Sequence, residues 1–254
     1  MIYPKFLYST LLRDVTPTFS GTTLSGKPPA NATDLLDWSY FTADTGNLDF
    51  NMTEDTDIDA VAIYVASGSG TNSIELQYES SPSTYTSLKT FSAPTGTLDI
   101  EEFTGVTVLS GRNIRFVITA TTTIDIRQLM VGEILTAEQG QWVSASPPAF
   151  NSGVKVTNNI SQNGSVLGRS IKRLERMGKI QLDWLTDSWV RSDWEPFSAH
   201  FARHPFFYQW DPTGHPTDVA FAFAERIDAP KHSENGYLSV TIPIRMLVAD
   251  SESI

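Results

Sequence analysis

The sequence predicts a mainly β protein with one or two helices, built as an N-terminal β-sandwich and a C-terminal α+β module. Short stretches in residues 1–136 alternate apolar and polar side chains between regularly spaced turn signals, as in an all-β sandwich. Residues 138–149 are polar and include a pair of prolines, which favours a linker. After residue 153, strand-like stretches surround one stretch with the apolar period of an amphipathic helix. We therefore expect two domains, at residues 1–136 and 153–254, joined by a linker at 137–152.

The strands of the first domain follow from period-two alternation. Residues 74–78 (IELQY) place apolar side chains on one face and polar ones on the other. Residues 113–118 form a nearly continuous apolar strand, as expected in the middle of a sandwich. Residues 124–135 are expected to form one further strand, with a bulge near Gly132.

In the second domain, strands are expected before and after one helix. The dipeptide Asn163-Gly164 is typical of a hairpin turn between the first strands. Ser192 and Glu195 resemble a capping box, so we expect the helix to begin there. Its apolar stripe consists of Val190, Trp194, Phe197 and Phe201. Strands are then expected at residues 206–210, 219–224 and 238–247, and the last has a bulge or an exposed edge at Pro243 because proline cannot donate to a ladder.

Composition argues against several classes of protein. The 254 residues suffice for one large domain or two, and the chain has no cysteine, so thiolate metal sites and disulfides are excluded. The net charge of −11 and the lack of a visible basic stripe argue against binding to a nucleic-acid backbone. No targeting segment and no membrane-spanning stretch are recognised, so folding in a cytosol is expected.

No catalytic or metal site is expected from residue spacing. His200 and His204 stand four apart, but the glutamate that a metalloprotease needs after the first histidine is missing. Residues 54–59 alternate acidic side chains without the glycine and glutamate of an EF-hand loop, so a solvated turn is expected. No G-x-S-x-G motif occurs, and paired carboxylates can be recognised only in space. We predict no enzyme activity, no cofactor and no metal.

Aromatic residues supply the candidate binding sites. Trp38 and Tyr40 would share one face of an extended segment and form a sugar-stacking platform, although ordinary sandwich packing is an equal use of such rings. Large rings also crowd into residues 184–210, and interfaces favour such rings; a dense local core is the alternative. The candidate subunit-interface residues are Trp189, which lies off the apolar stripe of the helix, and Trp184, Phe206, Tyr208 and Trp210.

A set of features in the first domain carries a resemblance to a known family. They are an Asn/Asp-rich loop at residues 29–37 followed by Trp38, strand-like stretches at 48–50 and 58–64, an R-x-h-x-h strand (h, apolar) at 112–117, and a last strand at 126–135. This order resembles that of galactose-binding-like (discoidin) jelly rolls over about half of the chain. The resemblance implies a jelly-roll fold, and such domains often hold a structural calcium ion.

Three segments of the second domain carry another resemblance: HPFFYQWDP (204–212), FAFAERIDAP (221–230) and GYLSVTIPIRML (236–247). They resemble the tail-tube-like module of siphophage tail-tip proteins, namely distal tail and minor tail proteins. The resemblance implies a structural component of a bacteriophage tail tip that forms a ring, expected to be hexameric, and contacts the tail tube and the tail hub or fibre proteins. It places the protein in the virion after synthesis in the host cytoplasm, with attachment to cell-surface carbohydrate as a further role.

The order of the two modules departs from this family, because many distal tail proteins place the ring module first. A stand-alone carbohydrate- or receptor-binding module is the alternative function. That alternative predicts a monomer or trimer with an open aromatic groove in the first domain.

Overall fold

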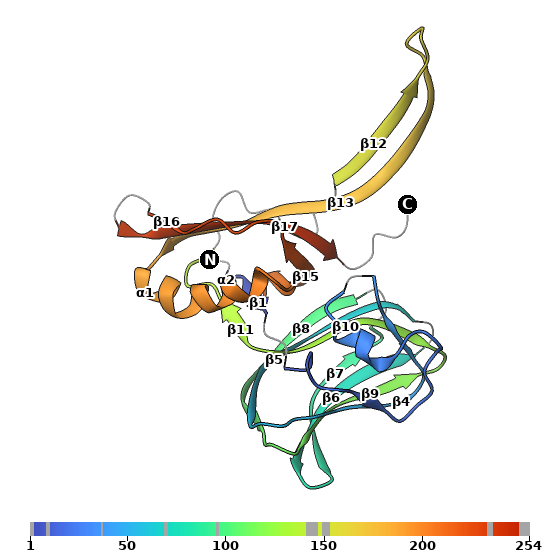
Figure 1. Ribbon diagram of the computed structural model, residues 1–254, viewed down its shortest axis with the longest axis vertical. Helices are drawn as coiled ribbons and strands as arrows, with labels where there is room; N and C mark the ends of the chain where they lie inside the picture. Colours follow the sequence, from blue (N-terminus) through green and yellow to red (C-terminus); the bar gives the residue numbers. More distant parts are fainter. Residues whose placement is uncertain are drawn as a thin grey trace.

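The computed structural model describes residues 3–8, 11–36, 38–68, 71–94, 97–140, 147–148, 153–232 and 236–248. Figure 1 shows two β-rich modules and a long two-stranded arm that projects from one module, away from the other. The predicted fold class, mainly β with a sandwich and a smaller α+β module, is confirmed.

The first module is a sandwich of two antiparallel sheets. One sheet has the strand order β3-β10-β5-β8 and the other β2-β4-β9-β6-β7. The bounds are β2 Thr18–Phe19, β3 Phe41–Ala43, β4 Gly46–Asn51, β5 Thr56–Gly68, β6 Asn72–Ser81, β7 Thr84–Ser92, β8 Thr97–Val108, β9 Asn113–Ala120 and β10 Ile124–Gly132, with a short 3-10 helix η1 at Pro29–Ala32.

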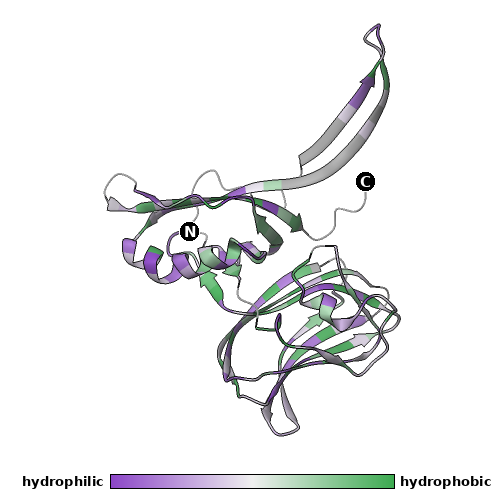
Figure 2. Ribbon diagram, viewed as in Figure 1, coloured by the Kyte–Doolittle hydropathy of each residue, from purple (hydrophilic) through white to green (hydrophobic). Residues whose placement is uncertain are grey.

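Strand β9 shows why these segments form a sandwich. Its buried residues are Ile114, Phe116 and Ile118, and the residues between them face outward. The same alternation of hydrophobic and hydrophilic residues runs along the other strands (Figure 2). The inward side chains of both sheets form one continuous core.

The sandwich of the first module, hereafter the jelly roll, is inserted into the second module. The strands on either side of it, β1 (Lys5–Leu7) and β11 (Ile134–Thr136), pair with each other and belong to the large sheet of the second module. The prediction of one continuous strand at 124–135 was therefore wrong, because the chain changes sheets after Gly132. The irregular pairing of β10 lies between Asp125 and Gln128.

Sheet membership thus assigns residues 5–7 and 134–136 to the second module. The expected domain ranges, 1–136 and 153–254, stay a prediction about independent folding. Most of the expected linker, at 137–152, lies outside the described residues.

The second module is an eight-stranded antiparallel sheet. Its order is β11-β1-β14-β15-β17-β13-β12, and β16 also pairs with β17. The bounds are β12 Gly153–Ile160, β13 Val166–Leu185, β14 Phe206–Asp211, β15 His215–Ala224, β16 Lys231–His232 and β17 Leu238–Val248. Pro243 pairs in register with Lys179 of β13, so the predicted bulge is absent there, and the register shift of β13 and β17 lies between Leu182 and Leu185. On the other side of β17, pairing with β15 ends at Ile244, so Pro243 lies where that edge of β17 leaves β15.

One helical segment covers a face of this sheet. It runs through α1 (Asp187–Trp189), a π-helical stretch (Val190–Trp194) and α2 (Glu195–Phe201). The predicted apolar stripe is confirmed, since all four of its residues are buried against the sheet. The expected start at Ser192 was wrong, because the helix begins one turn earlier. There Thr186 caps it by accepting the N–H of Trp189, and Glu138 accepts hydrogen bonds from Thr186.

A separate apolar cluster joins the two modules. Ala60, Ala62 and Met130 on the outer face of one jelly-roll sheet pack with Phe207 and Phe221 of the large sheet. All five side chains are fully buried. The jelly roll is therefore fixed to the second module by a shared core as well as by β1 and β11.

Candidate functional site

The arm consists of β12 and the first half of β13. The two strands pair from Gly153↔Glu175 to Ile160↔Val166, and β13 joins the large sheet only from Arg176 onward. About ten residues of β13 thus extend beyond the sheet, a length of roughly 33 Å at about 3.3 Å per residue. Among the described residues, no strand other than β12 pairs with this half of β13. The arm points into solvent at the top of Figure 1.

Three exposed apolar side chains flank the polar turn at the tip of the arm. Ile160, Val166 and Leu167 expose 62%, 63% and 73% of their surface, and Figure 2 shows hydrophobic residues near the tip. The turn between the strands is held by the Ser161 N–H, which donates to the Ser165 carbonyl oxygen at 2.8 Å. Gly164 adopts a φ of 80°, so the predicted Asn-Gly turn is confirmed. Exposed apolar side chains grouped on a projecting ribbon are typical of a surface that contacts another molecule.

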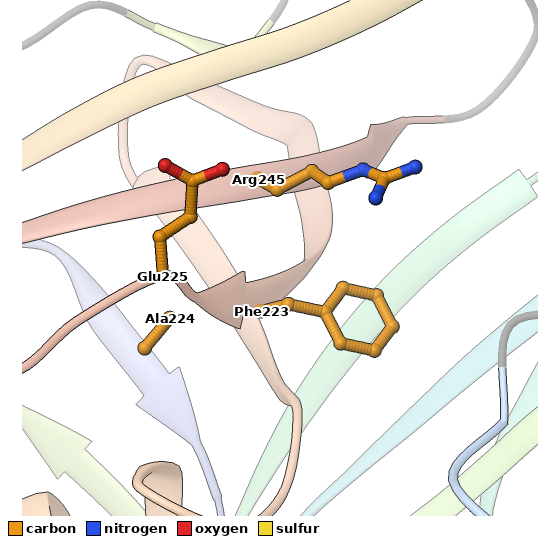
Figure 3. A pocket seen from close by; sticks show the side chains of 4 residues that line it. All are labelled: Phe223, Ala224, Glu225 and Arg245. Carbon is orange, nitrogen blue, oxygen red and sulfur yellow. The ribbon is translucent and has the colours of Figure 1, made fainter.

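A cavity lies beside the root of the arm. It has a volume of about 350 Å³ and is lined by Phe223, Ala224, Glu225 and Arg245 (Figure 3). Arg245 stands between Phe223 of β15 and Met177 of β13 in the sheet register. Within the described part of the chain, neither Glu225 nor Arg245 makes an ion pair. This site offers one ring and two opposite charges, and its lining contains no nucleophile with a base beside it.

Trp184 lies at the other end of β13, and sequence reasoning had placed it in an interface. Its side chain is 50% exposed and meets the ring of Tyr237, itself 39% exposed, edge to face at 5.7 Å. The backbone of Trp184 is left-handed, with a φ of 63°, because the strand bulges there. A bulky residue in this conformation costs roughly 1–2 kcal/mol, which glycine would avoid. Tyr237 was not among the predicted interface residues.

The other four predicted interface residues do not share this exposure. Trp189 and Trp210 are partly buried and pack against the core beneath the helix. Phe206 and Tyr208 are 0% and 1% exposed in that core, so their rings are already covered within the chain. Their place on alternate positions of β14, under the helix, explains this burial. The dense-core alternative accounts for these two rings, and Trp184 is the predicted residue that presents most surface to a partner.

The predicted sugar platform is split between an exposed and a covered ring. Trp38 is 72% exposed, whereas Tyr40 lies under the ammonium group of Lys27, which is 3.6 Å from the ring centroid. Between them Ser39 is buried and donates to Asp34 at 2.6 Å. Of the two rings, Trp38 therefore presents the larger exposed surface.

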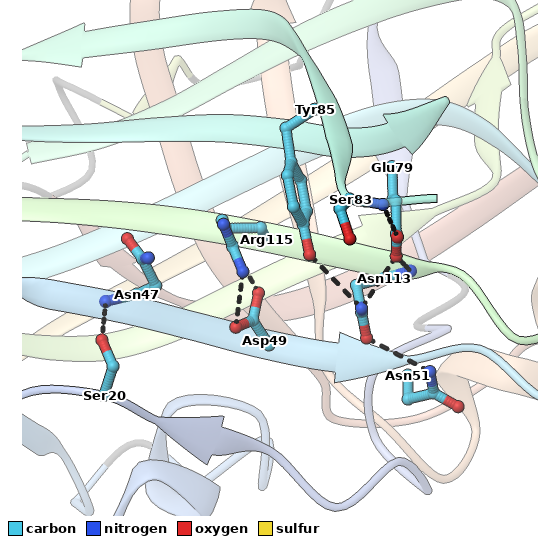
Figure 4. Close-up of polar contacts among 9 residues, drawn as sticks. All are labelled: Ser20, Asn47, Asp49, Asn51, Glu79, Ser83, Tyr85, Asn113 and Arg115. Atoms are coloured by element: carbon cyan, nitrogen blue, oxygen red, sulfur yellow. Dashed lines mark hydrogen bonds and ion pairs between the residues drawn. The ribbon is translucent and has the colours of Figure 1, made fainter. Parts of the chain in front are cut away.

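A polar row crosses the outer face of the five-stranded sheet (Figure 4). Arg115 donates two hydrogen bonds to Asp49, at 2.6 and 3.0 Å, and its guanidinium lies 3.7 Å from the ring centroid of Tyr85. Beside it, Glu79 accepts the backbone N–H groups of Ser83 and Asn113, and these bonds lower the pKa of Glu79. These groups are occupied by one another, so the row cross-links the strands.

The histidine pair lies beneath the N-terminal segment. The ring of His200 is 5.5 Å from Tyr8 and 5.0 Å from His204, and Arg13 donates to the Nε2 atom of His204 at 2.7 Å. Burial, together with the positive charges of His204 and Arg13, lowers the pKa of His200 to about 4, so the ring is neutral at neutral pH.

Metal ligands are not gathered in the described part of the chain. No group of three or more His, Cys, Asp or Glu side chains that could hold a metal ion occurs there. The acids of residues 54–59 include Asp55, which accepts the Ser110 N–H, and Asp57, which accepts the Thr107 hydroxyl. None of the described helices is long and apolar enough to cross a membrane.

Comparisons with known proteins match part of the chain. No family profile matches it, and no curated protein matches it. Among solved structures, a CBM32 module of a family 31 glycoside hydrolase from Clostridium perfringens is 17% identical with a TM-score of 0.41, covering 50% of this chain and 99% of that chain. A chitosan-binding module from a Paenibacillus chitosanase/glucanase is 15% identical with a TM-score of 0.40, covering 50% of this chain and 100% of that chain.

The CBM32 module of AlyQ is 19% identical with a TM-score of 0.38, covering 49% of this chain and 96% of that chain. Such identities and scores are too low to carry a functional property over to this protein. Nothing in these matches shows a phage tail-tip protein.

Proposed function

We propose that this protein is a structural subunit that assembles with further copies of itself through the arm, as a ring component of a bacteriophage tail tip. The observation that supports this proposal is the arm, which extends beyond its sheet and has three exposed apolar side chains near its tip. A two-stranded ribbon by itself is at best marginally stable in water. Contact with a neighbouring molecule would cover its tip and its strand edges.

A ring is a closed assembly that suits a subunit with a projecting arm. The arm and the rest of the module are different surfaces, so copies that join through them in one direction make head-to-tail contacts. Such contacts form a ring where the rotation between neighbouring copies closes. The segments at residues 204–212, 221–230 and 236–247 resemble those of distal tail and minor tail proteins, which favours a hexamer in the virion tail tip. The tail tube and the hub or fibre proteins are the partners that we propose above and below it.

The insertion of the jelly roll also suits this role. Because β1 precedes the jelly roll, the second module begins at the start of the described chain, and the sandwich extends from it as an accessory domain. Part of the second module therefore precedes the jelly roll in the sequence, which reduces the departure from the domain order of distal tail proteins.

Replacement of the arm by a two-residue turn tests this proposal. Gly153 and Glu175 are Cα partners, so an Asn-Gly dipeptide in place of residues 154–174 would close the hairpin at the sheet. We expect this variant to keep the circular dichroism spectrum and to be monomeric in mass photometry, under conditions in which the full chain forms a ring. A matched control shortens the β6–β7 hairpin of the jelly roll, which should leave the ring intact. A full-length chain that stays monomeric at high concentration contradicts the proposal.

A second candidate function is binding of carbohydrate by the jelly roll. The observation that favours it is Trp38, whose indole is 72% exposed on the segment that leads into β3. Exposed indoles stack on apolar faces of ligands. Isothermal titration with oligosaccharides should show binding that Trp38→Ala abolishes and that Leu109→Ala, a change at a 49% exposed residue, preserves. Equal binding by both variants would remove Trp38 from the proposal.

A further inference from the structure

The charge of the chain is divided between the arm and the remainder of the molecule. Residues 153–179, which form the arm and its root, carry six basic residues and one acid, Glu175. This segment therefore has a net charge of +5 within a chain whose net charge is −11, which leaves −16 on the remainder, here called the body. The basic residues are Lys155, Arg169, Lys172, Arg173, Arg176 and Lys179. Pairing of β12 with β13 joins these sequence positions in one ribbon, so the basic residues are concentrated in the arm and its root.

The body carries negative charge that its own cations do not neutralise. Outside residues 153–179 the sequence has 28 Asp and Glu residues against 12 Lys and Arg residues. Repulsion between neighbouring carboxylates is present at Asp59, which interacts with Asp57, Glu102 and Glu133. Burial first, and then repulsion by the other three carboxylates, raises the pKa of Asp59. A free subunit thus has a positive arm and an acidic body.

We infer that the arm of one copy lies against the acidic body of a second copy, and that charge attraction guides this contact. The inference rests on the proposed self-assembly and adds its partner surface and its physical basis. Within one molecule the arm points away from the jelly roll, so its charge is offset by another molecule (Figure 1). Complementary charges steer two copies into one relative orientation and disfavour contact between two arms or two bodies.

A nucleic-acid backbone is the other polyanion that a basic ribbon could meet. Here the same strand β13 continues into a body of net charge −16, which repels phosphate groups at close range. A second copy meets the same repulsion between bodies, but it also carries a basic arm of its own, so in a ring two arm–body attractions per subunit oppose that repulsion. The charge distribution therefore favours the copy of this chain over nucleic acid.

Two double variants of equal net charge test the inference. Lys172→Glu with Arg173→Glu reverses two charges on the arm, and Arg203→Glu with Lys231→Glu reverses two exposed charges on the body. Each pair lowers the net charge by four, so a general effect of charge on assembly is matched. Assembly of the full-length proteins is measured by sedimentation at about 0.1 M and about 1 M salt, where the Debye length falls from about 10 Å to about 3 Å.

We expect association of the unaltered chain to weaken roughly tenfold between the two salt concentrations. The arm pair should weaken association by a similar factor at low salt and should lose most of the salt dependence, whereas the body pair should behave like the unaltered chain. Equal behaviour of the two pairs, or assembly that is indifferent to salt, overturns the inference.

The remaining outcomes separate this inference from the proposed function. An arm pair that assembles normally but loses retention of duplex DNA assigns the arm to a phosphate backbone and also overturns the inference. If the Asn-Gly replacement abolishes assembly while the charge variants do not, the proposed function stands and the electrostatic contact fails. If the full-length chain is monomeric at both salt concentrations, the proposed self-assembly and the electrostatic contact are both contradicted.

Discussion

Phe221 joins the two modules, and its truncation tests whether they form one structure. Its side chain is fully buried in the cluster between the jelly roll and the large sheet. Its ring centroid lies 5.0 Å from that of Phe207, 5.2 Å from that of Phe223 and 6.4 Å from that of Tyr64. The first two rings belong to the second module and the third to β5 of the jelly roll, so one side chain contacts both modules.

Phe221→Ala should lower the free energy of unfolding by about 3–5 kcal/mol, the cost of removing a fully buried phenylalanine. Each aromatic pair contributes about 0.5–1.5 kcal/mol within that total. Phe221→Leu keeps most of the buried volume and should cost less than about 1.5 kcal/mol. Urea unfolding followed by circular dichroism and by tryptophan fluorescence measures both values.

The matched control is Phe116→Ala, which removes an equally buried ring from the core inside the jelly roll. It should cost a similar free energy without exposing the surface between the modules. Binding of a hydrophobic dye at low urea should therefore rise for Phe221→Ala and not for Phe116→Ala. A cost below about 1 kcal/mol for Phe221→Ala would mean that the ring faces solvent and that the modules are only tethered.

Four further results are expected. Thr186→Ala should lower the free energy of unfolding by about 1–2 kcal/mol in urea titrations, since it removes the helix cap, and Thr186→Ser should restore it. Asp49→Asn should cost about 1 kcal/mol in the same assay, because Arg115 loses a two-point ion pair at a partly exposed site. The folded-state pKa of His200, about 4, lies below the ordinary 6.5, so its contribution to stability is present above pH 6.5 and is lost as the pH falls toward 4; a His200→Phe variant followed by thermal melts at several pH values should lack this loss. Trp184→Gly should relieve a left-handed backbone and raise stability by about 1 kcal/mol while weakening assembly in mass photometry, and a variant that assembles normally would exclude Trp184 from the interface.

The sequence correctly predicted those elements that depend on the apolar pattern of neighbouring residues. The strand at residues 113–118 and the apolar stripe of the helix are each readable within a dozen residues, and both are confirmed. The start of the helix was misplaced because Thr186 caps it through a bond to Trp189 and is itself held by Glu138, 48 residues away in sequence. A capping pattern at Ser192 was equally good locally, so tertiary contacts decided the boundary.

Long-range pairing accounts for the larger errors. β1 has three residues, and its partners are β11 and β14, so no window of sequence contains the information that places it. β13 runs over 20 residues, but its middle part, rich in Lys and Arg, lacks the apolar alternation of a strand packed on a core, so its full length was not predicted. Because that part of β13 lies outside the large sheet, it does not pack on a core and needs no apolar face. Phe206 and Tyr208 were assigned to an interface because burial under a helix cannot be distinguished from burial under a partner by residue type alone.

The insertion of the jelly roll has a consequence for any assembly that the arm makes. The chain enters the sandwich from β1 and leaves it into β11, and these two strands are hydrogen-bonded neighbours in the large sheet. Two tethers at one point would permit rotation about that point, but the cluster of Ala60, Met130, Phe207 and Phe221 fixes the remaining freedom. The same sheet extends through β17 and β13 into the arm. The orientation of the jelly roll is thereby set relative to the arm, so a ring of copies joined through their arms would present every jelly roll, with its exposed Trp38, in one repeated orientation.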